Sequence, residues 1–187
     1  FGLAGRPYRV LAASGEAFHC EAIVLAAGAW SRGLARQLGA SVPLDTERGY
    51  HLMLPTAEPG LRRPVVHGEQ NFVLCPMELG TRLTCQSEFA GLEAPPDFRR
   101  ARRLLATAKR MLPSLEREEK SAWLGFRPSL PDSLPVLGPA PGLADVYLGF
   151  GHGHYGLTQG PVTGRILADL VAGRDPEIDL KPYRAGR

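Results

Sequence analysis

The sequence predicts an α/β lobe built from both ends of the chain, with a mainly antiparallel β lobe inserted between them. Continuous apolar runs near both ends, at 22–27 and 145–150, are typical of strands buried in a parallel sheet. Between them, shorter strand-like segments are separated by loops rich in Pro and Gly, which indicates antiparallel strands. A chain that leaves one lobe, builds a second and returns forms two discontinuous lobes, and clefts between lobes commonly hold ligands.

The composition is that of a folded globular protein. Of 187 residues, 44% are hydrophobic and 22% are charged. The net charge of +3 is too small to indicate a nucleic-acid partner, and it favours anionic small molecules only mildly. No apolar run approaches the roughly 20 residues that cross a bilayer. The chain begins with Phe1 and has no signal-type segment, so we expect it to be a piece of a longer protein.

Each lobe has its own predicted elements. The first lobe should contain a hairpin over 8–13 and 16–20, a strand over 22–27 and a helix over 31–38. The middle lobe should contain strands over 46–54, 71–74, 82–89 and 120–126, and one helix over 97–112. Apolar residues recur on that helix at i, i+3, i+4 and i+7, while Arg and Lys cover much of the rest. That basic surface is typical of a solvated face, and an acidic partner is the alternative.

A glycine-rich loop, Gly151–Gly156, follows the strand at 145–150 and precedes a helix at 157–172. It matches G-x-G-x-x-G, but a dinucleotide-binding unit needs a further parallel strand with an acidic residue, and none follows. Free N–H groups and partial positive charge at this helix start would still attract an electron-rich ring edge or an anion. Gly156, Gly160 and Gly164 leave one face of the helix bare, for a flat ring or simply for close packing.

The cysteines and histidines indicate no metal site. Cys20, Cys75 and Cys85 form no C-x-x-C pair, so the sequence predicts neither a disulfide framework nor a zinc site. We expect the three cysteines to be reduced thiols. His152 and His154 form an H-x-H pair without an apparent third ligand. Nucleophile elbows and phosphate-binding lysine loops are also absent from the sequence.

Three segments carry a family resemblance. The strand and turn Ala22–Ser31, the run from Gly125-Phe-Arg127-Pro128 to Gly138, and Gly151–Gly173 resemble, in the same order, motifs of the D-amino-acid oxidase/dehydrogenase superfamily. Glu47–Tyr50 is similar to the D-amino-acid dehydrogenase and glycine-oxidase-like branches.

The resemblance implies a partial FAD-binding lobe, 1–42 with 136–187, and a substrate-binding β-sheet lobe, 43–135, with helices on one side. In that family the true G-x-G-x-x-G lies in an N-terminal β-α-β unit that this sequence does not contain. Phe1 would then fall midway through the protein, and this piece alone would hold FAD weakly or not at all. An N-terminal FAD-binding segment of the same protein is the implied partner.

The resemblance also implies roles for individual residues of this sequence. Arg127 would bind the substrate carboxylate bidentately, with a structural salt bridge as the alternative. Tyr50 would lie over the substrate as the second catalytic residue, unless it is a half-buried strand tyrosine. Arg48 and His51 are expected on the opposite face from Tyr50, and Asp132 is expected to form a turn. The residues expected to contact FAD are Ala27, Gly28, Trp30, Gly151, His152, Gly153, Tyr155, Gly156, Leu157 and Thr158.

The implied reaction is hydride transfer from the α-carbon of an amino acid or secondary amine to FAD, which gives an imine that hydrolyses. One alternative is a non-catalytic ligand-binding or interaction module. Another is a flavoenzyme acting on a tRNA side chain or a polyol phosphate. No nucleic-acid partner, metal or transmembrane segment is expected. The expected location is the cytoplasm, with peripheral binding to the inner face of the membrane as the alternative. The flavin would be reoxidised by oxygen or by a membrane electron acceptor.

Overall fold

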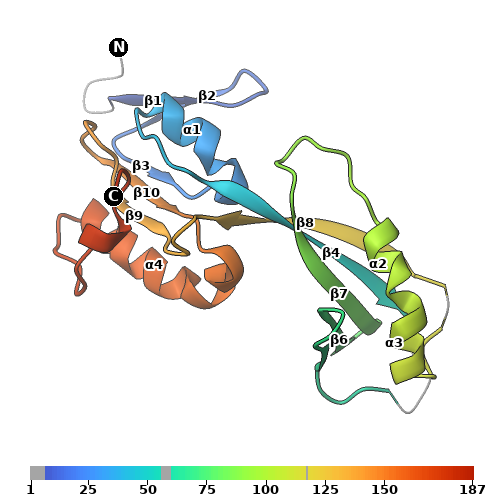
Figure 1. Cartoon of the computed structure of the whole chain (residues 1–187). Helices are drawn as coiled ribbons and strands as arrows, with labels where there is room; N and C mark the ends of the chain where they lie inside the picture. Colours follow the sequence, from blue (N-terminus) through green and yellow to red (C-terminus); the bar gives the residue numbers. More distant parts are fainter. Residues whose placement is uncertain (1–6, 56–59, 117) are drawn as a thin grey trace. The chain divides into compact units, whose positions relative to one another are not determined.

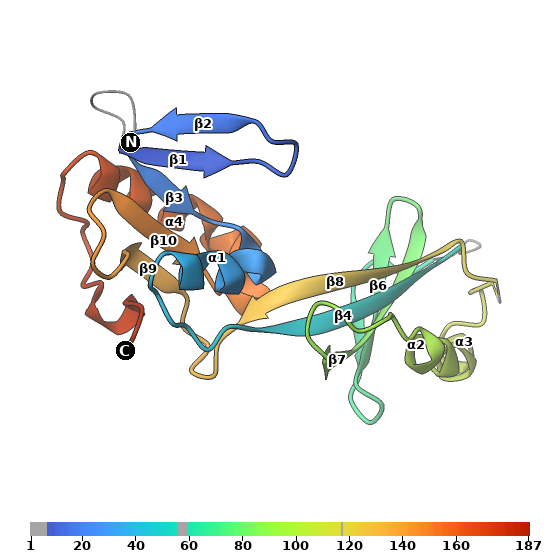
Figure 2. The same ribbon diagram turned by 90° about the horizontal axis from the view of Figure 1, so that it is seen from above.

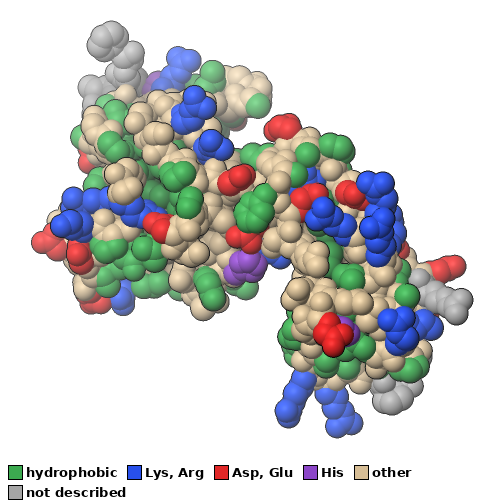
Figure 3. All heavy atoms as spheres, in the orientation of Figure 1, with side chains coloured by type: hydrophobic (Ala, Val, Ile, Leu, Met, Phe, Trp, Pro, Cys, Tyr) green, Lys and Arg blue, Asp and Glu red, His purple; other side chains and the backbone are tan. Residues whose placement is uncertain are grey.

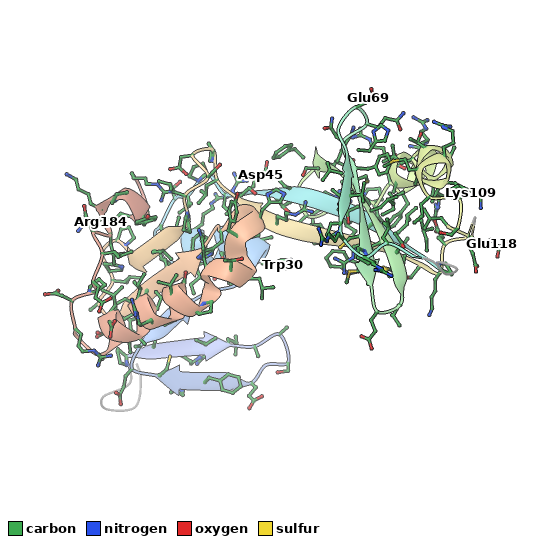
Figure 4. The ribbon with its side chains drawn as sticks, turned by 90° about the horizontal axis from the view of Figure 1, so that it is seen from below. Trp30, Asp45, Glu69, Lys109, Glu118 and Arg184 are labelled. Atoms are coloured by element: carbon green, nitrogen blue, oxygen red, sulfur yellow. The ribbon has the colours of Figure 1, made fainter. Side chains whose placement is uncertain are left out.

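The computed structural model describes residues 7–55, 60–116 and 118–187 (Figure 1). The chain divides into two compact units: unit 1 is Phe1–Asp45 with Arg127–Arg187, and unit 2 is Thr46–Phe126. Asp45, labelled in Figure 4, is the first residue of the strand on which the chain passes into unit 2. Unit 2 lies within the range 43–135 expected for the β-sheet lobe, and the predicted fold class, α/β with an antiparallel sheet, is confirmed.

Unit 1 contains a hairpin and a three-stranded sheet. The hairpin pairs β1 (Tyr8–Leu11) with β2 (Ala17–Cys20), as predicted. In the sheet, β10 (Val146–Phe150) is central, with β3 (Ile23–Leu25) parallel on one side and β9 (Val136–Pro139) antiparallel on the other. The sequence did not predict β9, because its four residues lie among prolines that indicate a loop.

Helices cover both faces of this sheet, as Figures 1 and 2 show. Leu148 packs in one core cluster with Ala35 of α1, whereas Gly149 lies beneath Leu167 of α4. Because successive residues of a strand point to opposite faces, α1 and α4 lie on opposite sides of the sheet. The helices of unit 1 are η1 (Gly28–Trp30), α1 (Ser31–Gln37), η2 (Gly153–Tyr155), α4 (Gly156–Val171) and η3 (Lys181–Tyr183).

The strand β3 was expected to be buried on both faces, and it is not. Leu25 is buried, but Val24 is 44% exposed. The reason is the position of β3 at the edge of the sheet, while α4 packs against β9 and β10 instead.

Unit 2 is built on a sheet with the strand order β5-β6-β7-β4-β8. Tyr50, Leu52 and Leu54 alternate along β4 and are all buried in its core. The strand β5 was not predicted, because three mostly exposed residues give no alternating pattern. The strands are β4 (Asp45–Leu54), β5 (Val65–His67), β6 (Phe72–Met77), β7 (Gly80–Phe89) and β8 (Ser121–Ser129).

Two short helices pack on one face of this sheet, where a single helix over 97–112 was predicted. They are α2 (Arg99–Arg103) and α3 (Leu105–Met111), and Leu104 separates them. The Leu104 N–H bonds to the Ala101 carbonyl at 3.1 Å, a contact three residues back that tightens the turn. Ala101 and Ala108 still share one core cluster, so the predicted apolar stripe is retained.

Two further properties concern the chain as a whole. Within the described ranges, none of the helices combines the length and apolar character needed to cross a membrane. Cys20, Cys75 and Cys85 are each partly buried, and none forms a disulfide.

Candidate functional site

Two loops leave the same edge of the unit 1 sheet. Strands β3 and β10 are parallel, with Leu25 opposite Leu148, so the segments that follow their carboxyl ends start side by side. In open α/β sheets this is the edge at which ligands bind. The first segment is 27–30, which includes η1, and the second is 151–158, which includes η2 and the start of α4. All ten residues expected to contact FAD lie in these two segments.

The glycine loop has no room for side chains at its first position. Gly151 is buried and has φ +89°, a conformation that L-residues rarely adopt. A β-carbon there would lie 2.6 Å from Cδ1 of Leu130. Gly28, in the other segment, also has a positive φ, of +55°. Both segments therefore turn tightly at these glycines, where the backbone carries no side chain.

The N-terminus of α4 is open to a ligand. Its N-cap residue Tyr155 makes no side-chain cap bond and its first turn holds no acidic residue, so neither a cap nor a local carboxylate balances the partial positive charge there. Leu157 and Tyr155 beside it are 95% and 64% exposed. An uncapped helix end next to exposed apolar side chains suits a flat, largely apolar group with an electron-rich edge.

The bare face of α4 is present as predicted. A β-carbon on Gly160 or Gly164 would meet no atom within 4 Å. A β-carbon on Gly156 would lie 3.6 Å from Cβ of His152, an ordinary packing contact, whereas close packing on Gly160 and Gly164 is not observed in the described part of the chain.

His152 points back into unit 1. Its Nε2 lies 2.9 Å from Oγ1 of Thr163, a buried residue of α4, and burial lowers the pKa of the imidazole. His154 is exposed. Among the described residues, no three His, Cys, Asp or Glu side chains are grouped so that they could bind a metal ion.

Arg127 lies near the end of β8, on a segment that runs onto the glycine loop. Its Nη1 is buried and has no hydrogen-bond partner, and in the part of the chain that the structure describes it forms no ion pair. Two and three residues further on, Ser129 Oγ lies 3.6 Å from the β-carbon position of Gly153, and Leu130 packs on Gly151. Arg127 as a whole is only partly buried, but a buried guanidinium N–H group without a partner is unfavourable, so this arginine suits a ligand oxyanion. Within residues 7–55, 60–116 and 118–187, Arg127 forms no salt bridge, so the structural alternative is not observed there.

Tyr50 belongs to a buried polar network in unit 2. It is 2% exposed; its hydroxyl donates to Glu88 Oε2 at 2.6 Å and accepts the Asp97 N–H at 3.2 Å. Burial first, and then the hydrogen bond to Glu88, raises the pKa of the phenol. Arg48, fully buried, donates to the Pro95 carbonyl at 3.1 Å and places its Nε 3.4 Å from Glu88 Oε2.

The expectation that Arg48 points away from Tyr50 is wrong. The Arg48 guanidinium lies 5.9 Å from the Tyr50 ring centroid, because residues two apart on a strand share a face. His51 does lie on the other face, where it stacks on Trp123 at 5.0 Å. Sequence reasoning also missed Glu88. Arg48 and Glu88 are opposite each other in the β4–β7 register, and this register cannot be read from local patterns.

Asp132 forms a turn, as predicted. Its Oδ1 accepts the Leu134 N–H at 3.1 Å, and Oδ2 lies 2.7 Å from Nε of Arg187. The Arg187 hydrogen bond is the main reason that the pKa of Asp132 is lowered. A carboxylate committed to an arginine in this way is a poor general base.

Comparisons with known proteins identify the family of the chain. A family model described as FAD dependent oxidoreductase matches residues 2–170. The chain is 41% identical over 172 residues to a D-amino-acid oxidase from Bradyrhizobium diazoefficiens, covering 90% of this chain and 41% of that protein. It is 35% identical over 191 residues to a D-amino acid dehydrogenase from Methylobacterium sp. (strain 4-46), covering 98% and 44%. Its fold matches the crystal structure of glycine oxidase from Geobacillus kaustophilus with a TM-score of 0.81 and 28% identity, covering 93% and 47%.

The chain therefore belongs to the FAD-dependent oxidoreductase family. The relatives that it matches within the family are named as oxidases and dehydrogenases of amino acids. The chain spans less than half the length of each of these three proteins.

Proposed function

We propose that the full-length protein is an FAD-dependent oxidoreductase that oxidises an amino acid or a secondary amine. The observation that carries the proposal is the unpaired, buried Nη1 of Arg127, on the segment that packs against the glycine loop. The names of the relatives support an amino-acid substrate. Arg127, on the segment that packs against the glycine loop, favours a carboxylate substrate over a tRNA side chain or a polyol phosphate.

The residues present fit FAD at the edge formed by 27–30 and 151–158. The open end of α4, the buried Gly151 and the exposed Leu157 would hold a flat ring system with backbone N–H groups and apolar contacts. When bound, FAD supplies the hydride acceptor for the reaction. We propose that 1–42 and 136–187 serve the cofactor and that 43–135 serves the substrate.

The chain's own residues would bind and orient the substrate. Arg127 would hold the carboxylate with two parallel hydrogen bonds, which fixes the position of the α-carbon and keeps a permanent positive charge beside it. The phenol of Tyr50, held neutral and oriented by Glu88 and Asp97, would be a second hydrogen-bond donor to the substrate. The phenol has one O–H group, so it can donate to the substrate only if it gives up its hydrogen bond to Glu88.

An N-terminal segment of the same protein would complete the FAD-binding lobe. The strand β3 is at the edge of its sheet, with Val24 44% exposed, and the relatives are more than twice as long as this chain. Addition of a strand at that edge would cover Val24 and supply the pyrophosphate loop. Without that segment we expect this chain to bind FAD weakly and to be inactive. A cytoplasmic location, with or without contact to the inner face of the membrane, stays a prediction.

The test is the anaerobic visible spectrum of the full-length protein before and after addition of D-amino acids, glycine, sarcosine and proline. We expect a yellow protein that one of these compounds bleaches, and bleaching that is lost in Arg127→Ala. Arg9→Ala, which removes an exposed arginine from the β1–β2 hairpin, is the control and should bleach normally. A colourless protein, or a yellow protein that none of the compounds bleaches, would contradict the proposal.

A further inference from the structure

A pocket separate from the proposed FAD and substrate site lies on the helix-covered face of unit 2. It has a volume of about 280 Å³ and is lined by Cys85, Gln86, Arg100, Arg103 and Leu104. Arg100 and Arg103 are three residues apart on α2, so they extend from the same face of the helix. The lining contains two positive charges and no acidic side chain. Lys and Arg side chains gather on the surface over α2 (Figure 3).

The four arginines of α2 divide into two kinds. Arg99 lies 2.8 Å from Asp97, and Arg102 lies 2.5 Å from Glu119. In the described part of the chain, Arg100 and Arg103 form no ion pair. Asp97, the acid nearest to Arg100 in sequence, is hydrogen-bonded to Arg99. Those hydrogen bonds are the main cause of its pKa of about 2, and the charge of Arg100 makes a smaller contribution. The two unpaired arginines are the ones that line the pocket.

A β-bulge brings a third polar group to the same place. In the β4–β7 register Gly49 is opposite Ser87 and His51 is opposite Thr84. Two residues of β7, Cys85 and Gln86, are therefore opposite a single residue of β4, Tyr50. Neighbouring residues of a regular strand point to opposite faces, but a bulge redirects one of them. Both side chains therefore line the pocket, and the Gln86 carboxamide adds an uncharged N–H donor beside the arginines.

We propose that this pocket binds a small oxyanion, a carboxylate or a phosphate, between the guanidinium groups of Arg100 and Arg103. Planar guanidinium groups bind such oxygens in pairs, and Gln86 supplies a further hydrogen bond. Because both arginines are exposed, salt weakens the binding. The site goes beyond the proposed oxidation, which uses none of these residues.

The experiment is isothermal titration calorimetry of the full-length protein at low ionic strength. Inorganic phosphate is titrated in one arm and succinate in the other, so that the two oxyanion classes are distinguished. We expect saturable binding of at least one of them at one site. The double variant R100Q/R103Q should weaken this binding about tenfold or more, and Gln86→Leu should weaken it severalfold.

The matched control is R62Q/R63Q, which removes two exposed arginines from a loop of the same unit and changes the net charge equally. Its affinity should stay within about twofold of the unmodified protein, because the proposal depends on placement and not on total charge. Absence of saturable binding in both arms would overturn the proposal. An equal loss in R62Q/R63Q, or unchanged affinity in R100Q/R103Q, would overturn it as well.

Discussion

Leu130 packs against Gly151 so closely that its Cδ1 lies 2.6 Å from the point that a β-carbon on the glycine would occupy. This contact ties the segment after Arg127 to the first residue of the glycine loop. The position of Arg127, the residue proposed to bind the substrate carboxylate, is therefore coupled to the shape of the glycine loop, the proposed cofactor site.

Gly151→Ala should destabilise the protein and weaken FAD binding. The new methyl group would meet Leu130, and φ of +89° is unfavourable for alanine, which together predict a loss of about 1–3 kcal/mol. Urea unfolding of the full-length protein with and without FAD measures both effects. Gly33→Ala on α1, where a β-carbon meets open space, is the control and should be neutral or stabilising by about 0.5–1 kcal/mol. Equal stability of the two variants would count against the packing role given to Gly151.

Arg127→Lys should be much less active than the unmodified protein although the charge is kept. A lysine ammonium is a point charge and cannot form two parallel hydrogen bonds to a carboxylate, so orientation of the α-carbon is lost. We expect a fall in kcat/KM of about 10- to 100-fold with the flavin spectrum unchanged. Steady-state kinetics of the full-length protein are the measurement, and activity within twofold of the unmodified protein would exclude the bidentate contact.

The buried network of unit 2 should depend on Arg48 and Tyr50 to different extents. Arg48→Ala leaves Glu88 without its ion-pair partner, and we expect a loss of about 3–5 kcal/mol. Tyr50→Phe removes one hydroxyl and should lose only about 1–2 kcal/mol. Denaturant unfolding of the two variants compares them directly, and an equal loss would show that the arginine is not the centre of the network.

Tyr50 should also make the protein less stable in alkali. Its pKa is raised in the folded state, so its contribution is present below the unfolded value of about 10 and is lost as the pH rises above it. Unfolding midpoints measured from pH 8 to 11 should fall less steeply in Tyr50→Phe than in the unmodified protein. Parallel curves would mean that this phenol does not titrate differently in the two states.

His152 should destabilise the protein in mild acid. Burial lowers its folded pKa, so its contribution is present above the unfolded value of about 6.5 and is lost as the pH falls through the folded value. His152→Gln should reduce the dependence of the unfolding midpoint on pH between 7.5 and 5. An unchanged pH dependence in His152→Gln would contradict the role given to this imidazole.

Apolar runs and glycines in the sequence predicted the buried strands and the tight turns of the fold. The apolar runs that became β3 and β10, and the glycines after them, were visible because buried strands and tight turns need particular residues. The contacts between distant segments were not visible. Neither the packing of Leu130 on Gly151 nor the pairing of Arg48 with Glu88 leaves a local signal, since both depend on tertiary placement and strand register.

Short or interrupted elements were missed for a related reason. The strand β5 has three residues and β9 has four, too few for a period to show, and both are held by neighbouring strands. The interruption at Leu104 is invisible in the apolar pattern because both helices keep their stripe on the same core.

The central claim is that Arg127 binds the carboxylate of the substrate. It is tested most directly by comparing an amino-acid substrate with the amine that lacks its carboxylate, in the full-length protein and in Arg127→Ala. The measurement is the rate of anaerobic flavin reduction by each compound. We predict that the unmodified protein strongly prefers the amino acid and that Arg127→Ala loses this preference while its rate with the amine is little changed. An unchanged preference in Arg127→Ala would contradict the account.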